Sequence, residues 1–472
     1  MSAHSFSEGM VLDGFTLVER LHKGGMATLW RVEKPGQDAP LLMKIPQLVN
    51  NDDPAAIVGF EVEQMLMPRL YGPHVPKFIA AGDFTAQPYI VMEHIAGHSL
   101  RARLDAAPID YAEVAGIGAR VATALHDLHR QHVIHLDVKP SNIMFRPDGR
   151  AVLIDFGLSR HDRLPDLLAE EFRLPMGTGP YISPEQVLGI RNDPRSDLFA
   201  LGVMLYHFAT GERPFGFPTS VAGLRKRLKQ AAVPPRALRP DFPPWLQEVI
   251  LRCLEVEPRR RYASAAEVAF ALQHPDQVAL TERAALTSRE GVLRKMKRWF
   301  KSIGAEPLMP GNVADQLERA PFIMAAVDLS AGSTALAEKL RATARRSVSI
   351  EFGARLACVT VQKTARIGLD SIVDEAGRNI HVKHLVALKD WARPLALPAE
   401  RVTFHVLEAP DAATAIVEYA AANHVDHVLI GARGSGAMRR YLGSVSSEVV
   451  ARAPCSVTVV RAAAREAVDD HA

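Results

Sequence analysis

Two features of the first fifty residues could bind a phosphate group. Lys44 lies inside the apolar run 41–45, where an ammonium group is costly to bury unless it meets an anion. Gly24 and Gly25 lie between two strand-like runs, and residues without a Cβ let backbone N–H groups approach phosphate oxygens. Each feature also has an ordinary interpretation. Lys44 could be an edge-strand lysine whose head reaches water, and the glycines could form a tight hairpin.

The surrounding elements would have to bring these groups together. About twenty residues after Lys44, a helical pattern opens at 60–63 and continues through Leu70. If that helix packs on the lysine strand, Glu63 can pair with Lys44, although nothing local demands it. Short apolar runs, Gly/Pro punctuation and longer helical patterns alternate throughout residues 10–275, unlike the polar and basic stretch at 276–318 that follows.

A set of short motifs follows in a fixed order. The segment 133–142 reads Val-Ile-His-Leu-Asp-Val-Lys-Pro-Ser-Asn, followed by Asp-Phe-Gly at 155–157 and Ser-Pro-Glu at 183–185. With Lys44 upstream, these resemble the catalytic loop, the metal-binding triplet and the later acidic motif of protein kinases. The resemblance covers residues 12–273, and it implies the α+β two-lobed protein kinase fold.

Three details resemble the bacterial serine/threonine kinases most closely: Gly-Gly-Met at 24–26, Asp-Val-Lys-Pro-Ser-Asn at 137–142 and Pro-Glu-Gln at 184–186. The resemblance implies a non-specific serine/threonine protein kinase that uses ATP and Mg²⁺, phosphorylates protein substrates and also phosphorylates itself. Lys139 and Thr178 favour serine and threonine over tyrosine as acceptors.

The resemblance also implies roles for individual catalytic residues. Asp137 would accept the proton of the substrate hydroxyl, and Lys139 would balance charge on the γ-phosphate. Lys44, oriented by Glu63, would hold the α- and β-phosphates. Asn142 and Asp155 would bind Mg²⁺, because hard oxygen ligands suit that ion.

Further residues would line the nucleotide and receive the peptide. The backbones of Glu93 and Ile95 would hold adenine, beside Met92 as the gatekeeper. The remaining ATP-binding residues would be Leu21, Gly24, Gly25, Leu29, Lys44, Asn142 and Asp155. Thr178 and Glu185 would belong to the activation and peptide-binding segment. Asp197 would anchor the catalytic loop from below, and Arg261 would pair with Glu185.

The chain departs from the kinase pattern in its glycine-rich loop. His22 stands where the first glycine usually is, and Ala27 where the third is. Both add a Cβ near the phosphates. The favoured interpretation is a tolerated variant with weaker ATP binding, because the other catalytic residues are present. The alternative is a catalytically weak pseudokinase that acts as a scaffold or nucleotide sensor.

A second departure concerns regulation. Leu136 stands where regulated kinases have the arginine that gathers a phosphate on the activation loop. Between residues 158 and 176 the only hydroxyl side chain is Ser159. We therefore expect no activation by phosphorylation within this loop. Four acidic residues of the loop could supply constitutive negative charge instead, although a solvated face is favoured for them: Asp162, Asp166, Glu170 and Glu171.

The C-terminal region alternates buried strands with Ala-rich helices, which predicts a parallel sheet covered by helices. It is similar to the universal stress protein family over residues 319–462, with the α/β fold of adenine nucleotide alpha hydrolase-like domains. The match is carried by Ala-Val-Asp at 326–328, Gly-x-x-Gly at 431–434, and Gly-Ser-Val-Ser at 443–446 with the Pro-Cys-Ser-Val that follows.

The nucleotide-binding branch of that family implies a second site at Asp328, Gly431, Gly434, Gly443 and Ser444. Eight residues separate Gly434 from Gly443, where the ATP-binding pattern has nine, so dimerisation through the last strand stays an open alternative. We interpret His381, His384 and Trp391 as scattered surface or helix-packing residues, and we expect no metal site there.

Composition sets the outer limits. The 472 residues carry 56 Lys and Arg against 53 Asp and Glu, a net charge of +3, which gives no reason to expect nucleic-acid binding. Three widely spaced cysteines, the lack of a secretory signal and the lack of a membrane-spanning run predict a cytoplasmic protein. The expected domains are 10–275 and 319–462, joined by a basic linker at 276–318. Residues 289–301 could lie on a membrane surface, but packing on a neighbouring domain is favoured.

Overall fold

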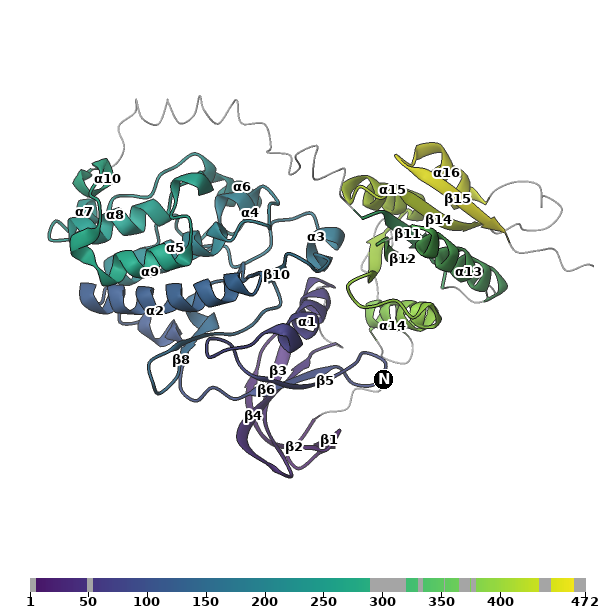
Figure 1. The fold of residues 1–472 in the computed structure, drawn as a ribbon, viewed down its shortest axis with the longest axis horizontal. Helices are drawn as coiled ribbons and strands as arrows, with labels where there is room; N and C mark the ends of the chain where they lie inside the picture. Colours follow the sequence, from purple (N-terminus) through teal and green to yellow (C-terminus); the bar gives the residue numbers. More distant parts are fainter. Residues whose placement is uncertain are drawn as a thin grey trace, which may run out of the picture.

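The computed structural model describes residues 6–48, 54–288, 320–329, 334–351, 353–364, 374, 379–432 and 443–461. Figure 1 shows two lobes of the N-terminal region on one side and an α/β domain on the other. This is the two-lobed α+β fold, followed by a parallel-sheet domain, that the sequence predicts.

The N-terminal lobe is a six-stranded antiparallel sheet with one helix, α1, packed against it. The strand order is β1-β2-β3-β4-β6-β5. The bounds are β1 (Val11–Leu12), β2 (Phe15–Lys23), β3 (Ala27–Lys34), β4 (Gln37–Pro46), α1 (Pro54–Leu66), β5 (Phe78–Gly82) and β6 (Tyr89–Glu93).

Alternation along β4 places the candidate lysine. Leu41, Met43 and Ile45 are buried in one cluster with residues of β2 and β3. Successive side chains of a strand point to opposite faces, so Lys44 emerges on the other face, where α1 lies. The apolar run therefore supplies both the sheet core and the direction of the lysine.

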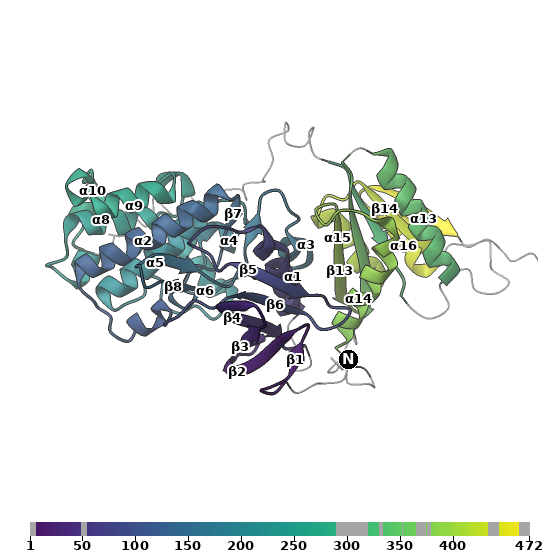
Figure 2. The same ribbon diagram turned by 60° about the horizontal axis from the view of Figure 1, so that its bottom comes forward.

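The C-terminal lobe is mainly helical (Figure 2) and also carries two small two-stranded sheets. Its helices are α2 (Tyr111–Arg130), α3 (Leu167–Glu171), α4 (Pro184–Val187), α5 (Arg195–Thr210), α6 (Val221–Arg225), α7 (Pro235–Leu238), α8 (Pro244–Cys253), α9 (Ala265–Gln273) and α10 (Glu282–Ala285). The strands β8 (Ile143–Phe145) and β9 (Ala151–Leu153) form one sheet, and β7 (Val133–Ile134) and β10 (Arg160–His161) form the other.

The central helices α2, α5 and α9 pack closely. Asp110 caps α2 by accepting hydrogen bonds from the N–H groups of Ala112 and Glu113. Gly118 of α2 faces Leu205 and Leu272, and a Cβ at this glycine would lie 2.8–2.9 Å from their methyl groups. Residues 276–288, which the sequence assigns to the linker, continue along this lobe through α10, which contacts α8.

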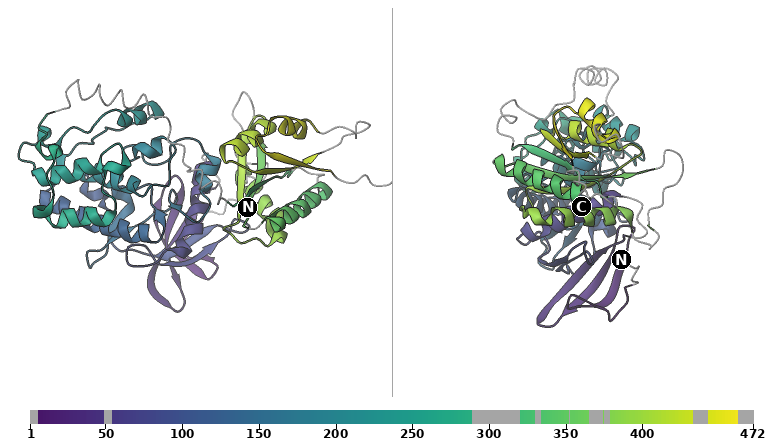
Figure 3. Two further views of the ribbon diagram at one scale, coloured as in Figure 1. Left: turned by 45° about the horizontal axis from the view of Figure 1, so that its top comes forward. Right: turned by 90° about the vertical axis from the view of Figure 1, so that its right-hand side faces the viewer.

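The C-terminal domain is a five-stranded parallel sheet of order β13-β12-β11-β14-β15, with helices on both faces (Figure 3). Its elements are β11 (Phe322–Ala326), α13 (Thr334–Ile350), β12 (Arg355–Lys363), α14 (Ile380–Ala392), β13 (Val402–Ala409), α15 (Ala412–Ala422), β14 (His427–Ala432), α16 (Ser444–Arg452) and β15 (Ser456–Arg461). Alternate residues of β11 join two cores. One core includes α13 and α14, and the other includes α15 and α16.

The C-terminal domain lies against α1 and α3 of the N-terminal region (Figures 1 and 2). Its elements β13 and α15 contact α3, and Lys389 of α14 pairs with Glu61 of α1. One hydrophobic cluster runs from the N-terminal region into α14. Within the part of the chain that the structure describes, no helix has both the length and the apolar character needed to cross a bilayer. The basic segment 289–301 lies outside that part.

The predicted pairing of Glu185 with Arg261 is confirmed. Arg261 donates to the two Glu185 oxygens at 2.6 and 2.8 Å, and both side chains are buried. We predict that Glu185→Gln destabilises the C-terminal lobe by about 3–5 kcal/mol, because it leaves a buried guanidinium without its counter-charge. Urea unfolding of the full chain measures this change.

The control is Arg260→Ala, which breaks a neighbouring pair with Glu257 whose side chains are half exposed. We expect it to change the unfolding free energy by less than about 1 kcal/mol. Equal effects of Glu185→Gln and Arg260→Ala would contradict the importance of the buried pair.

Candidate active site

The lysine of β4 meets two carboxylates. Lys44 Nζ lies 2.6 Å from Glu63 Oε2 and 3.0 Å from Asp155 Oδ1. Burial alone would lower the pKa of Lys44, but the two carboxylates outweigh it and raise that pKa. The Lys44 ammonium lowers the pKa of Asp155 to about 2, so Asp155 is ionised at neutral pH. The structure thus brings Lys44, Glu63 and Asp155 together, as the sequence predicts.

The backbone at Asp155 turns sharply. Asp155 has φ +66°, in the left-handed region that non-glycine residues rarely adopt. Phe156, the next residue, is fully buried with its ring 5.3 Å from the His135 ring. Gly157 approaches α1 closely, because a Cβ at Gly59 would lie 3.1 Å from the Gly157 carbonyl oxygen. The position of the triplet is therefore tied to the position of α1.

A buried carboxylate below the catalytic loop holds the loop backbone. Asp197, in the first turn of α5, accepts the N–H of His135 at 2.9 Å and the N–H of Leu136 at 2.8 Å. His129 lies 2.8 Å from the same carboxylate. Leu136 has φ +61°, so these two hydrogen bonds support a strained segment. The anchoring contact that the resemblance implies for Asp197 is present.

Asp137 lies at the centre of a polar network. Lys139 Nζ lies 2.6 Å from Asp137 Oδ2, and Asn142 Nδ2 donates to the same oxygen at 3.1 Å. The N–H and hydroxyl of Thr178 both donate to Asp137 Oδ1, at 3.1 and 2.8 Å. Lys139 also reaches the Thr178 hydroxyl at 2.8 Å. Three predicted residues from two separate segments, Lys139, Asn142 and Thr178, therefore converge on the Asp137 carboxylate.

The predicted metal ligands fit a hard cation. Asn142 donates its amide hydrogens to the Asp137 carbonyl and carboxylate oxygens, which leaves Asn142 Oδ1 as the acceptor atom. The Asp155 carboxylate is half exposed, and one of its oxygens contacts Lys44. One amide oxygen and one ionised carboxylate are ligands that Mg²⁺ accepts, with water and phosphate oxygens completing its shell.

The glycine-rich hairpin is a closed turn between β2 and β3. Gly24 donates its N–H to the Ala27 carbonyl oxygen at 3.0 Å, and a Cβ at Gly24 would lie 3.3 Å from His22 Nε2. Gln47 Nε2 donates to the Gly24 carbonyl oxygen at 2.8 Å and so ties the turn to the end of β4. Sequence reasoning missed Gln47, because no local pattern relates it to residue 24.

The strand β6 leads to the predicted adenine position. Met92 and Ile95 are buried, and the Glu93 N–H donates to the Lys77 carbonyl oxygen at 2.8 Å. The Glu93 carboxylate forms an ion pair with Arg146, and this contact lowers the pKa of Glu93. Leu21 and Leu29, the two predicted leucines of the hairpin, lie on neighbouring strands, with Leu29 directly opposite Lys44. Sequence reasoning also missed Arg146.

The prediction that the four acidic residues of the activation segment form a solvated face is wrong for three of them. Asp166 caps α3 and lies 2.9 Å from Arg191, while the side chains of Glu170 and Glu171 are 9% and 4% exposed. Asp162 is the member that is exposed. Three of the four acids are therefore paired and largely buried, because cationic side chains far away in sequence cover them. Ser159 is buried and donates to the His135 carbonyl oxygen.

The predicted second nucleotide site is described only in part, since Gly434 lies outside the described residues. Asp328 follows β11, Gly431 lies in β14, and Gly443 precedes Ser444, the first residue of α16. A Cβ at Gly431 would lie 2.9 Å from Leu336 of α13, so helix packing also requires a glycine there.

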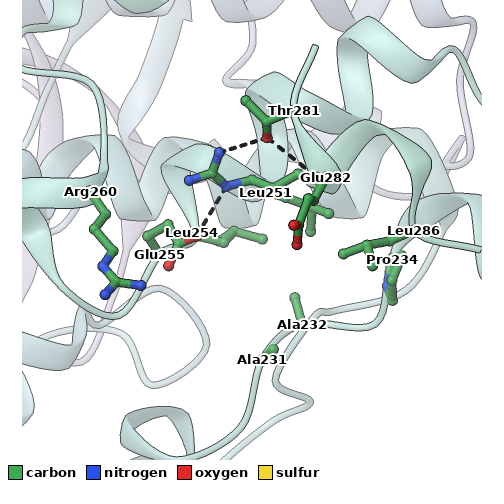
Figure 4. Close-up of a pocket in the computed structure, with 11 residues that line it drawn as sticks. Ala231, Ala232, Pro234, Leu251, Leu254, Glu255, Arg260, Thr281, Glu282 and Leu286 are labelled. Carbon is green, nitrogen blue, oxygen red and sulfur yellow. Dashed lines mark hydrogen bonds and ion pairs between the residues drawn. The ribbon is translucent and has the colours of Figure 1, made fainter. Parts of the chain in front are cut away.

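A cavity of about 410 Å³ lies at the far side of the C-terminal lobe (Figure 4). It is lined by α8, α10 and the loop at 231–234, and none of the predicted site residues borders it. The polar side chains Arg283, Glu255 and Thr281 of its lining bind one another, because Arg283 lies 3.0 Å from Glu255 and donates a hydrogen bond to Thr281. We assign it no part in the chemistry.

Comparisons with known proteins agree with both domains. The protein kinase domain family matches residues 15–275, and the universal stress protein family matches residues 322–461. A probable serine/threonine-protein kinase of Clostridium acetobutylicum is 29% identical over 262 residues, which are 55% of this chain and 40% of that protein. The serine/threonine-protein kinase pkn3 of Myxococcus xanthus is 34% identical over an alignment of 269 residues that covers 54% of this chain and 48% of the relative.

A tyrosine-protein kinase of Myxococcus xanthus, MasK, is 31% identical over 277 residues, with 55% of this chain and 42% of that protein covered. The crystal structure of the Mycobacterium tuberculosis PknI kinase domain matches with 26% identity and a TM-score of 0.44, covering 57% of this chain and all of that domain. The matched region spans less than half the length of the curated relatives named above.

The kinase family covers more than half of the chain, and the chain therefore belongs to the protein kinase family. Its C-terminal region carries a universal stress protein domain.

The network around Asp137 gives a prediction about Thr178. We expect Thr178→Val to lower the rate of peptide phosphorylation about tenfold, because removing one hydroxyl bond to a charged acceptor costs about 1.5 kcal/mol. Thr178→Ser keeps the hydroxyl and should stay within about threefold of the parent rate. Initial-rate kinetics compare the three proteins, and equal rates for the serine and valine variants would contradict the prediction.

Proposed function

We propose that the chain is an ATP- and Mg²⁺-dependent serine/threonine protein kinase. The observation that carries this proposal is the joint arrangement of Lys44, Glu63 and Asp155 beside the network of Asp137, Lys139 and Thr178. Phosphoryl transfer needs positioned charge more than covalent chemistry, and both groups of contacts supply it.

In the proposed reaction Asp137 accepts the hydrogen bond, and then the proton, of a substrate hydroxyl group. The hydroxyl oxygen forms a new bond to the γ-phosphorus of ATP, and the bond from that phosphorus to the β,γ-bridging oxygen breaks. Lys139 balances the charge of the transferred group, while Lys44 holds the α- and β-phosphates. Mg²⁺, held by Asp155 and Asn142, supplies charge neutralisation on the phosphates when it is bound.

The proposed acceptor is serine or threonine. Its support is Lys139 and Thr178, the two residues by which the sequence resembles serine/threonine kinases, because both contact the Asp137 carboxylate. One of the relatives is a tyrosine-protein kinase, so the acceptor amino acid has to be determined by experiment.

A catalytically weak scaffold or nucleotide sensor is the competing function. Its support is His22 and Ala27 in the glycine-rich hairpin. The contact of Lys44 with Glu63 at 2.6 Å and the contacts of Asp137 argue against idle catalytic residues. The experiment described below distinguishes the two functions.

We further propose that the kinase phosphorylates itself as well as other proteins, in the cytoplasm, where ATP is available and its three free cysteines stay reduced. The stress-protein domain would act as a nucleotide-sensing or dimerisation module. Asp328, Gly431, Gly434, Gly443 and Ser444 remain its proposed nucleotide residues. Dimerisation would use β15, because that strand is the sheet edge opposite β13 and has no neighbour beyond it in the described residues.

The test is phosphoamino-acid analysis after incubation of the full chain with labelled ATP, Mg²⁺ and a generic protein substrate. We predict label on serine or threonine. We expect Asp137→Asn to lower it by about 10²–10⁴-fold, the usual contribution of a general base. Asp276→Asn, the same change at an exposed site, should leave the label unchanged.

Binding of ATP without any labelled amino acid would refute the proposed function and support the sensor. Label on tyrosine alone would refute the acceptor class. Label that persists in Asp137→Asn would refute the role of Asp137.

A further inference from the structure

The C-terminal domain buries the acidic end of α3. Glu170 Oε1 lies 2.7 Å from Arg355 of β12, and Glu170 Oε2 lies 3.0 Å from His405 Nε2 of β13. The other ring nitrogen of His405 lies 3.3 Å from Glu171. Asn423 donates to the Glu170 backbone carbonyl oxygen at 3.0 Å. Glu170 and Glu171 thus have their partners in a different domain.

This cluster places two basic side chains against two carboxylates. Burial alone would lower the pKa of His405, but hydrogen bonds to Glu170 and Glu171 outweigh it and raise that pKa to about 9, so the ring is cationic at neutral pH. The fully buried His405 ring and the Arg355 guanidinium face the two carboxylates. His381 of α14 lies 3.9 Å from Glu171, and Tyr419 of α15 contacts Glu170. Losing either cation would leave buried carboxylates poorly compensated.

The helix that carries Glu170 and Glu171 is too short to be stable without contacts to the rest of the protein. α3 has five residues, and isolated helices of that length are not stable in water. At its other end Arg191 binds Asp166 and also donates to the Leu158 carbonyl oxygen at 2.9 Å. The activation segment is therefore fixed at one end by the C-terminal lobe and at the other by the stress-protein domain.

A second contact reaches α1. Lys389 of α14 forms an ion pair with Glu61, and the same ammonium lies 4.8 Å from the ring centre of Phe84. Asn379 at the start of α14 donates to the Leu48 carbonyl oxygen at 2.7 Å, just beyond β4. Both contacts bind the C-terminal domain to the lobe that carries Lys44.

The geometry of α1 connects this contact to the site. Glu61 and Glu63 are two residues apart, so they point about 200° apart around the helix. Glu63 faces Lys44 while Glu61 faces Lys389, and each side chain is almost fully buried. A helix held on both sides in this way keeps Glu63 within reach of the lysine.

We infer that Lys389, His405 and Arg355 are positioning residues for the kinase site, which hold α1 and the activation segment in the arrangement that a loop phosphate provides in regulated kinases. In those kinases a phosphate on the loop is gathered by arginine. Here the anions are Glu170 and Glu171, and the cations come from the stress-protein domain. This inference depends on the proposed kinase function.

The experiment is a charge swap in the full chain. We predict that Lys389→Glu lowers kcat for a serine peptide about tenfold, in the usual range of couplings between sites, and leaves the peptide KM within about twofold. The double variant Glu61→Lys with Lys389→Glu restores an ion pair and should return kcat to within about threefold of the parent value. Lys339→Glu, the same change on an exposed face of α13, is the matched control and should have no effect.

A second variant tests the α3 contact. Arg355→Met removes the cation but keeps an apolar side chain over Phe322, which Arg355 now covers at 4.6 Å. We expect faster amide hydrogen exchange at 167–171 and a lower kcat. For Lys389→Glu we expect faster exchange at 54–66, which the swap returns to the parent rate.

Unchanged kcat and unchanged exchange in Lys389→Glu and Arg355→Met would overturn the inference, and so would higher kcat in either. Lys389→Glu effects that the swap does not restore would overturn the role of the ion pair. If the parent chain were inactive, the proposed function would fail, and the exchange data alone would decide whether these residues hold α1 and α3.

Discussion

The buried ammonium of Lys44 is the constraint on which the other contacts depend. It lies between Met43 and Ile45 on an apolar strand, so it is stable only with anions beside it. Asp155 provides one anion from the C-terminal lobe and Glu63 provides the other from α1. The site therefore exists only while α1 stays against the sheet. The close approach of Gly59 to Gly157 transmits the same requirement to the Asp-Phe-Gly turn.

Local patterns predicted the residues of this site well, because each motif combines a required side chain with a required backbone shape. The kinase fold, the parallel sheet and the pairing of Glu185 with Arg261 all followed from such motifs. The contacts that hold these motifs in place could not be predicted in the same way. Gln47 and Arg146 are ordinary polar residues in the sequence, and only the fold shows that they bind Gly24 and Glu93.

The largest difference concerns charges that look solvated in the sequence. Glu170 and Glu171 form an acidic pair in a polar loop, and the sequence leaves His381 as a scattered surface or helix-packing residue. The structure buries all three at the boundary between the domains. No periodicity in either segment could indicate this, because the partners lie more than 200 residues apart. Contacts between domains depend on how two finished folds meet, which short patterns do not encode.

The central claim is that carboxylates of this chain assemble the kinase site without a phosphate on the activation segment. The direct measurement is a time course of peptide phosphorylation by full-length protein from which a phosphatase has removed all phosphate, as checked by intact mass spectrometry. The account predicts a linear course from the first time point, at the rate of protein preincubated with ATP. A lag that preincubation abolishes, together with phosphate appearing on Ser159, would contradict it.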